Sequence, residues 1–220
     1  MPRSVAYFLS ILFHPLLIVS YMLVLLLMMN PYLFGVNNWS DQIPLVVILM
    51  FSTFFMPVLM VGMMKKLELV NSLELADRQE RILPYILSGF FYIVMTVFFI
   101  YHPDMPNAFT TFVLGTTIAL FAAFIVNLFS KVSAHATGMG GLVGMVVISS
   151  WQFSSGTIFL KLGADLSLQV NVLLLLGIVV LLAGLVGTAR LQLKAHVMQD
   201  LYGGYLIGFV SQFVALRFIF

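Results

Sequence analysis

The sequence contains no cysteine, and Asp, Glu, Lys and Arg together make up only 8% of its 220 residues. The absence of cysteine excludes a disulfide framework, thiolate catalysis and a cysteine-ligated metal site. A soluble domain averages about 25% charged and about 45–50% apolar residues, whereas 62% of this chain is hydrophobic. The formal net charge of +2 also lacks the strongly basic balance of nucleic-acid-binding proteins. The composition therefore indicates an integral membrane protein.

Long apolar runs with short connections account for most of the chain. A membrane-spanning helix needs about 20 mainly apolar residues, and seven segments qualify as candidates. They are residues 5–29, 43–64, 82–101, 108–129, 138–155, 170–188 and 201–220. The fifth is short and rich in Gly, Ser and Thr, while the first is too long for a cleaved signal peptide and is expected to be retained. We expect an all-α polytopic transmembrane bundle of six to seven spans, with seven favoured, that forms a single domain over residues 1–220.

Charged residues gather in three of the connections. These are residues 65–81, 130–138 and 190–200. With seven spans, two membrane crossings separate each connection from the next, so all three lie on one face and can converge at one end of the bundle. The connections of the other face carry no comparable cluster. They are residues 30–42, 102–107 and 156–169.

The third polar connection carries the strongest chemical signal. Arg190, His196 and Asp200 stand between two apolar runs, and ionisable groups at a bilayer are costly unless they have a function. On a helix, the four-residue spacing places His196 and Asp200 on one face. A carboxylate that holds one imidazole nitrogen leaves the other nitrogen free to act as a base or a nucleophile.

Together the three connections supply the groups of a phosphate site. The cations are Arg78, Arg81, Lys131 and Arg190, a further donor is Ser133, and the groups that handle protons are His135, His196 and Asp200. Arg suits bidentate contact with phosphate oxygens, and Lys adds a point charge. Two histidines can divide phosphoester hydrolysis between a nucleophile and an acid for the departing oxygen. The one carboxylate among these residues is too few for a two-metal phosphatase centre, so no metal and no other cofactor is expected.

The same residues resemble the motifs of the type 2 phosphatidic acid phosphatase (PAP2) superfamily. Its third motif is matched by Arg190-x5-His196-x3-Asp200, the Ser-Gly-His core of its second by Ser133-Ala134-His135, and its first, Lys-x6-Arg-Pro, is placed at Arg78-Gln-Glu-Arg81-Ile-Leu-Pro84. The chain departs from the family pattern at Val132, Ala134 and Ala189, and Asn71 and Glu74 stand where the first-motif Lys is expected. Lys131 is a candidate to replace that lysine.

The resemblance implies a role for each matching residue. His196 would be the nucleophile that forms a phosphohistidine, and Asp200 would orient it. His135 would be the general acid. The residues that bind the phosphoryl group would be Arg190 and Ser133 with Arg78, Arg81 and Lys131. It implies a metal-independent phosphatase of a membrane lipid phosphate or pyrophosphate, with isoprenyl pyrophosphate marginally favoured, in a bacterial inner membrane. A lipid or anion transporter, or a binding protein of the same fold without hydrolysis, would use the same cations and remains open.

Some polar and small residues have structural explanations. We expect His14 to satisfy a backbone carbonyl that Pro15 frees, and so to lie outside the site. Small-xxx-small spacing indicates close helix packing; it occurs at Gly140/Gly144 and Gly204/Gly208. Lys and Arg are more numerous on the face that holds the three charged connections. Because four of them are candidate phosphate ligands, this charge bias does not show on which side of the membrane the site lies.

Overall fold

The computed structural model spans residues 1–220 and describes all of them except 72–74, 76, 153–156 and 162–166. The predicted all-α class is confirmed, with one short hairpin added. The helices are α1 Arg3–Leu12, α2 Pro15–Met29, α3 Ile43–Met50, α4 Met56–Lys66, α5 Ile82–Tyr101, α6 Asn107–Phe129, α7 Ala134–Gln152, α8 Val172–Gln192 and α9 Met198–Ile219. A π-helical stretch, Phe51–Phe55, joins α3 to α4, and 3-10 turns lie at Pro31–Phe34, Trp39–Gln42 and Gln79–Arg81.

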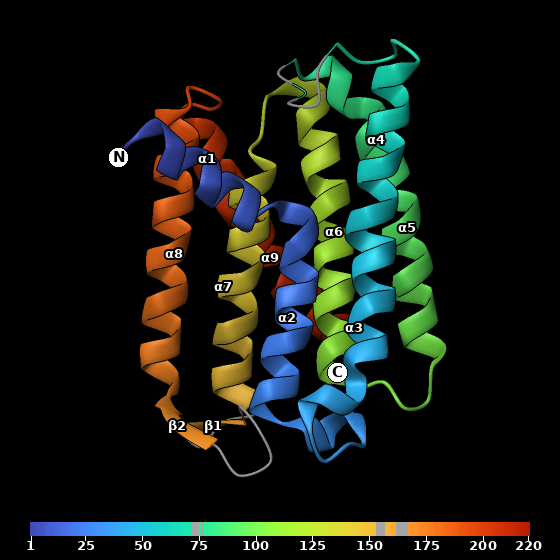
Figure 1. Ribbon diagram of the computed structural model, residues 1–220, viewed down its shortest axis with the longest axis vertical. Helices are drawn as coiled ribbons and strands as arrows, with labels where there is room; N and C mark the ends of the chain where they lie inside the picture. The colour runs from blue at the N-terminus through green and yellow to red at the C-terminus, as the bar shows by residue number, and fades with distance from the viewer. Residues whose placement is uncertain (72–74, 76, 153–156, 162–166) are drawn as a thin grey trace.

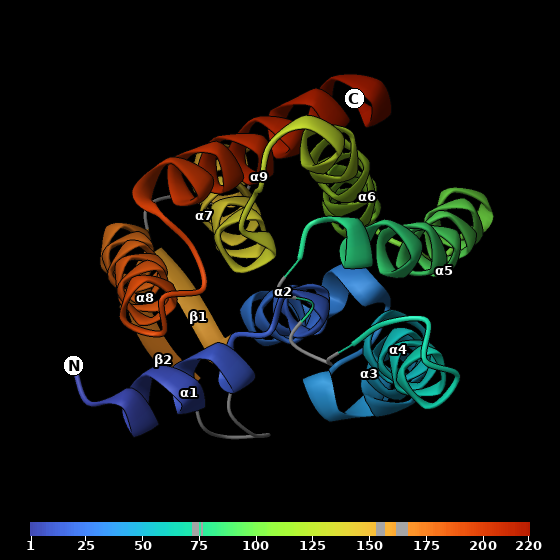
Figure 2. The same cartoon turned by 90° about the horizontal axis from the view of Figure 1, so that it is seen from above.

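Within the described residues, five helical segments are long and apolar enough to cross a membrane. They are Pro31–Lys66, Gln79–Tyr101, Asn107–Phe129, Val172–Gln192 and Met198–Ile219, and α1 with α2 makes a sixth if this bent pair is one span. These segments define an integral membrane protein. The helix α7 does not belong to this set. It lies among α2, α6, α8 and α9 (Figure 2), and a helix covered by protein needs no apolar surface toward lipid.

The first predicted span, residues 5–29, is not one straight helix. The axes of α1 and α2 differ by 60°, and the break lies at His14, whose φ of −62° and ψ of 134° are extended. Pro15 causes this break, because proline lacks an N–H and disfavours the helical conformation of the residue before it. As a result α1 turns away from α2 and packs against α8 at one end of the bundle (Figures 1 and 2).

The connection between α7 and α8 contains an antiparallel hairpin that was predicted as a loop. Strand β1, Thr157–Lys161, pairs with β2, Ser167–Asn171, in the register Thr157 to Asn171. The end of β2 occupies the first residues of the segment predicted as the sixth span, so α8 starts only at Val172. The end of the fifth predicted span, residues 153–155, lies outside the described residues.

The helices α7 and α9 pack so closely that their crossing requires glycine. A Cβ on Gly208 would lie 1.9 Å from the carbonyl oxygen of Thr137, and one on Gly140 would lie 2.3 Å from the carbonyl oxygen of Tyr205. Gly144 and Gly204 face the same interface. The small-xxx-small prediction is therefore confirmed, and the close approach fixes the start of α9 beside the start of α7.

The three polar connections meet at one end of the bundle, at the top of Figure 1. The Arg81 Nη1 donates to the carbonyl oxygen of Val132 at 3.0 Å, which joins the first connection to the second. The Ser133 N–H donates to the carbonyl oxygen of Asp200 at 3.2 Å, which joins the second to the start of α9. The hairpin and the 3-10 turns that follow α2 lie at the opposite end.

Candidate functional site

The connection from α8 to α9 is a tight reversal that positions two site residues. The helix α8 ends in a Schellman motif, in which the N–H of Lys194 donates to Leu191 O at 2.9 Å and the N–H of Ala195 donates to Arg190 O at 3.1 Å. Lys194 takes the left-handed conformation that this motif requires, with φ of 55°. The reversal leaves Arg190 in the last turn of α8 and places His196 just before α9.

His196 and Asp200 are in contact, as their four-residue spacing predicts, although His196 lies just before the helix that contains Asp200. The imidazole Nδ1 lies 3.0 Å from Asp200 Oδ2, and His196 precedes α9 while Asp200 lies in its first turn. The same carboxylate oxygen accepts the N–H of Val197 at 3.3 Å, which fixes the carboxylate at the helix start. Because a carboxylate only accepts, Nδ1 carries the proton and Nε2 keeps its lone pair.

Burial and nearby cations keep His196 neutral. Only 7% of the residue is exposed, and this burial is the main reason why its pKa falls from 6.5 to about 4. The charges of Arg81, Arg190 and Lys131 lower the pKa further, while the hydrogen bond to Asp200 opposes the shift. At neutral pH the imidazole therefore carries no charge, as a nucleophile requires.

His135, near the start of α7, is held in a similar way. Its Nε2 lies 3.0 Å from the carbonyl oxygen of Ser10 in α1. A carbonyl oxygen only accepts, so Nε2 carries the proton and Nδ1 is available for a second proton. Each of the two histidines is thus oriented through one ring nitrogen, which leaves the other nitrogen for chemistry.

The cations have different supports. Arg190 Nη1 donates to Ser10 Oγ at 3.3 Å, and Arg81 Nε donates to Leu75 O at 2.8 Å. Lys131 is half-buried, and its pKa is lowered by burial first and then by the charge of Arg81. Neither Arg81 nor Lys131 forms an ion pair with a carboxylate of the described residues. The region therefore holds positive charge that an anion can neutralise.

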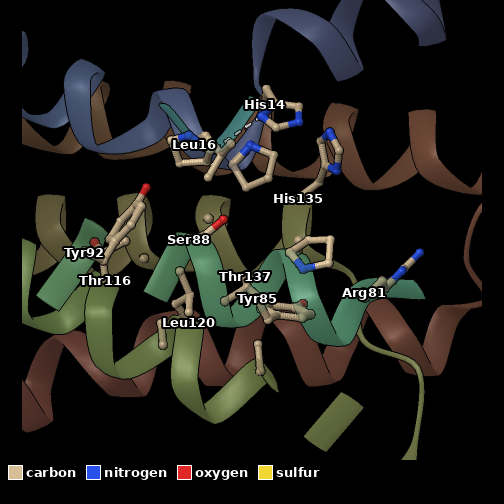
Figure 3. A pocket seen from close by; sticks show the side chains of 18 of the residues that line it. His14, Leu16, Arg81, Tyr85, Ser88, Tyr92, Thr116, Leu120, His135 and Thr137 are labelled. Atoms are coloured by element: carbon tan, nitrogen blue, oxygen red, sulfur yellow. Dashed lines mark hydrogen bonds between the residues drawn. The ribbon is translucent and has the colours of Figure 1, made fainter. Parts of the chain in front are cut away.

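A cavity of about 390 Å³ opens beside these groups and continues between the helices (Figure 3). Its polar end is lined by His14, Arg81, His135, Arg190 and His196. Its body is mainly apolar and is bordered by side chains of α2, α4, α5, α6, α7 and α9. A pocket with an apolar body and a few converging polar groups is typical of a ligand site.

Three predicted phosphate ligands lie outside the cavity wall. Arg78 is exposed, and its Nη1 donates to the carbonyl oxygen of Phe129 at the end of α6. Ser133 is fully buried, and its Oγ caps α7 by accepting the N–H of Ala136 at 3.3 Å. Lys131 also lies off the wall, but its charge acts on His196.

The structure places His14 in the site, contrary to the sequence prediction. Its Nδ1 accepts the N–H of Leu16 at 3.4 Å, so it caps α2 and does not donate to a freed carbonyl. Its ring centroid lies 5.6 Å from that of His135, in an edge-to-face arrangement. The sequence signal for His14 is a histidine within an apolar run. Ser10, which bonds His135 and Arg190, and Gln212, which lines the cavity, carry no comparable signal in the sequence.

Among the described residues, no three His, Asp or Glu side chains gather in an arrangement that could hold a metal ion. Comparison of the chain with protein-family models, curated proteins and solved structures finds no match. Function is therefore inferred from the cavity and the groups that line it.

Proposed function

We propose that this protein is a membrane lipid phosphatase of the PAP2 type. One observation carries the proposal: a single cavity has His135, His196, Arg81 and Arg190 at its polar end and an apolar body between the helices. A lipid phosphate is divided in the same way, into an anionic headgroup and a hydrocarbon chain. The buried pair of His196 and Asp200 supplies an oriented, neutral nucleophile.

The proposed reaction has two steps. In the first, a lipid phosphate that binds as its monoanion gives its proton to Nδ1 of His135, and the Nε2 lone pair of His196 attacks phosphorus. The bond from phosphorus to the lipid oxygen breaks, and that oxygen takes the proton from His135. In the second, water gives a proton to His135 and attacks phosphorus, which breaks the bond to His196 and releases phosphate. Asp200 stabilises the imidazolium character of His196 through its Nδ1–H in both steps.

The surrounding charges stabilise the transition state. Arg81 and Arg190 line the wall where the phosphoryl oxygens would lie, and the positive charge of Lys131 acts on His196. The α7 N-terminus, at Ala134 and His135, adds the positive end of a helix dipole. Preorganised donors and charges of this kind are usually the largest contribution to catalysis of phosphoryl transfer. No metal is part of this proposal.

The proposal includes a topology of seven spans in a bacterial inner membrane. The bent pair of α1 and α2 supplies the first span, the continuous run through α3 and α4 the second, and α5 to α9 the remaining five. We include α7 because its 19 residues extend about 28 Å at 1.5 Å per residue, which approaches the hydrocarbon thickness of about 30 Å. An even number of crossings then separates the three polar connections, so they share one face.

The test is phosphate release from a panel of lipid phosphates and pyrophosphates by the purified protein in detergent with EDTA. We expect the wild type to release phosphate and His196→Ala to lose at least 100-fold of this activity while keeping its unfolding temperature. His102→Ala is the matched control, because His102 lies in the turn between α5 and α6 at the opposite end of the bundle. Full activity of His196→Ala, or lipid flux through liposomes without hydrolysis, would contradict the proposal.

A further inference from the structure

Gln212, in the middle of α9, is a polar side chain buried among helices. Its exposure is 0%, and neither its amide nitrogen nor its amide oxygen has a hydrogen-bond partner within the described part of the chain. A buried group without a partner costs about 1–3 kcal/mol, and folded proteins retain few of them. The side chain borders the cavity that holds the histidines. A molecule bound in the cavity therefore lies next to this side chain.

Three glycines on two neighbouring helices leave room for this amide. A Cβ on Gly115 of α6 would lie 2.5 Å from Gln212 Oε1, and a Cβ on Gly141 of α7 would lie 3.3 Å from Gln212 Nε2. A Cβ on Gly144 would lie 3.1 Å from the Gln212 Cγ. Larger residues at these positions would displace the side chain, so the slot between α6 and α7 fixes the amide at the cavity wall.

The amide lies far below the phosphate end. Gln212 follows Asp200 by twelve residues on α9, which is about 18 Å at 1.5 Å per residue. Because α9 is inclined to the other helices (Figure 2), this distance is longer than the depth of the amide, but it still separates Gln212 from a phosphate held by His196 and Arg190. A ligand group that meets Gln212 therefore belongs to the chain of a lipid and not to its headgroup.

A row of polar groups along the helical run Gln79–Tyr101 connects the two ends of the cavity. The row is Arg81, Tyr85, Ser88 and Tyr92, whose spacing of four, three and four residues places them on one face (Figure 3). The hydroxyl of Tyr85 is also buried without a partner among the described residues. One side of the apolar body thus offers hydrogen-bonding groups at several depths.

We propose that the Gln212 amide binds an oxygen function, a hydroxyl or a carbonyl, carried on the hydrocarbon chain of the lipid. The amide offers both donors and an acceptor, so it can bond a chain hydroxyl in two ways. A bare hydrocarbon chain would leave these groups unpaired, and sites built for a hydrogen bond reject ligands that lack it. The cavity therefore selects an oxygenated chain over the isoprenyl chain that the family resemblance favours. The inference rests on the proposed function only for the phosphate headgroup.

The test uses alkyl phosphonates, which cannot be hydrolysed, with one chain length and a single hydroxyl placed at successive carbons. Binding to the wild type is measured by thermal stabilisation, with the unsubstituted phosphonate as reference. We expect one positional isomer to bind about tenfold more tightly than the reference, as one buried hydrogen bond supplies. Gln212→Leu should lose this preference. Thr116→Val is the matched control, because the Thr116 hydroxyl also lines the cavity but already donates to Phe112 O at 2.9 Å.

Equal affinity of the wild type for every isomer would overturn the inference, as it would if the amide held only water. The positional series in the wild type decides this even if Gln212→Leu does not fold, and Gln212→Met then serves as the second variant. The two proposals fail separately. A positional preference without any lipid phosphatase activity removes the proposed function and keeps the inference, whereas phosphatase activity without a preference does the reverse.

Discussion

Replacing Asp200 tests how much the buried carboxylate contributes to catalysis. Its Oδ2 holds the Nδ1–H of His196 at 3.0 Å, and the two residues are 7% and 8% exposed, so water cannot replace the bond easily. A hydrogen bond to a charged group contributes about 1.5–3 kcal/mol. Asp200→Ala should therefore lower kcat/KM by about 10- to 150-fold, at 1.36 kcal/mol for each factor of ten.

Asp200→Asn separates the charge of this group from its geometry. An amide oxygen can still accept from His196 and from the N–H of Val197, but a neutral acceptor is about half as strong as a charged one. We expect kcat/KM to fall by about tenfold or less, with the unfolding temperature preserved, while the alanine variant also loses about 1 kcal/mol of stability with its helix cap. The assay is phosphate release in detergent beside thermal unfolding of each variant. Wild-type kcat/KM in both folded variants would refute the role of the carboxylate.

Further predictions address packing, electrostatics and backbone conformation. Gly208→Ala should prevent close contact of α7 with α9 and lower the unfolding temperature sharply. The control is Gly177→Ala, on the exposed face of α8 with no atom within 4 Å, which should stabilise the protein by about 0.5–1 kcal/mol; equal effects of the two variants would contradict the close α7–α9 interface. Lys131→Met removes a charge that lowers the pKa of His196. The acid limb of the pH profile of kcat/KM, where activity falls as His196 is protonated, should therefore move to higher pH. An unmoved limb would show that the charge of Lys131 does not act on His196. Lys194→Gly relieves a left-handed residue with φ of 55° and should raise stability by up to about 1 kcal/mol in thermal unfolding, and a loss of stability would contradict the Schellman assignment.

The helical class and the pairing of His196 with Asp200 could be predicted because both depend on short-range patterns. Apolar runs of about 20 residues specify membrane helices, and a four-residue spacing brings two side chains into contact in a helix or at its first turn. Glycine spacing predicted close helix packing for the same reason, but it did not predict that α7 and α9 are the helices that pack on each other. The exact helix starts were missed, since α9 begins at Met198 and the hairpin occupies the predicted start of α8.

Long-range contacts were the part that the sequence did not reveal. Ser10 holds both His135 and Arg190 only because the break before Pro15 turns α1 back over the bundle. That turn also brings His14 to the cavity wall. Such contacts depend on the angle between helices, which no local spacing encodes.

The most direct test of the central claim is to trap the covalent intermediate. The wild type is mixed with a lipid phosphate labelled at phosphorus, quenched in base, which preserves phosphohistidine, and mapped by peptide analysis. The account predicts label on His196 within the first turnover and no label in His196→Ala. Turnover without labelled protein, or label that persists in His196→Ala, would contradict His196 as the nucleophile.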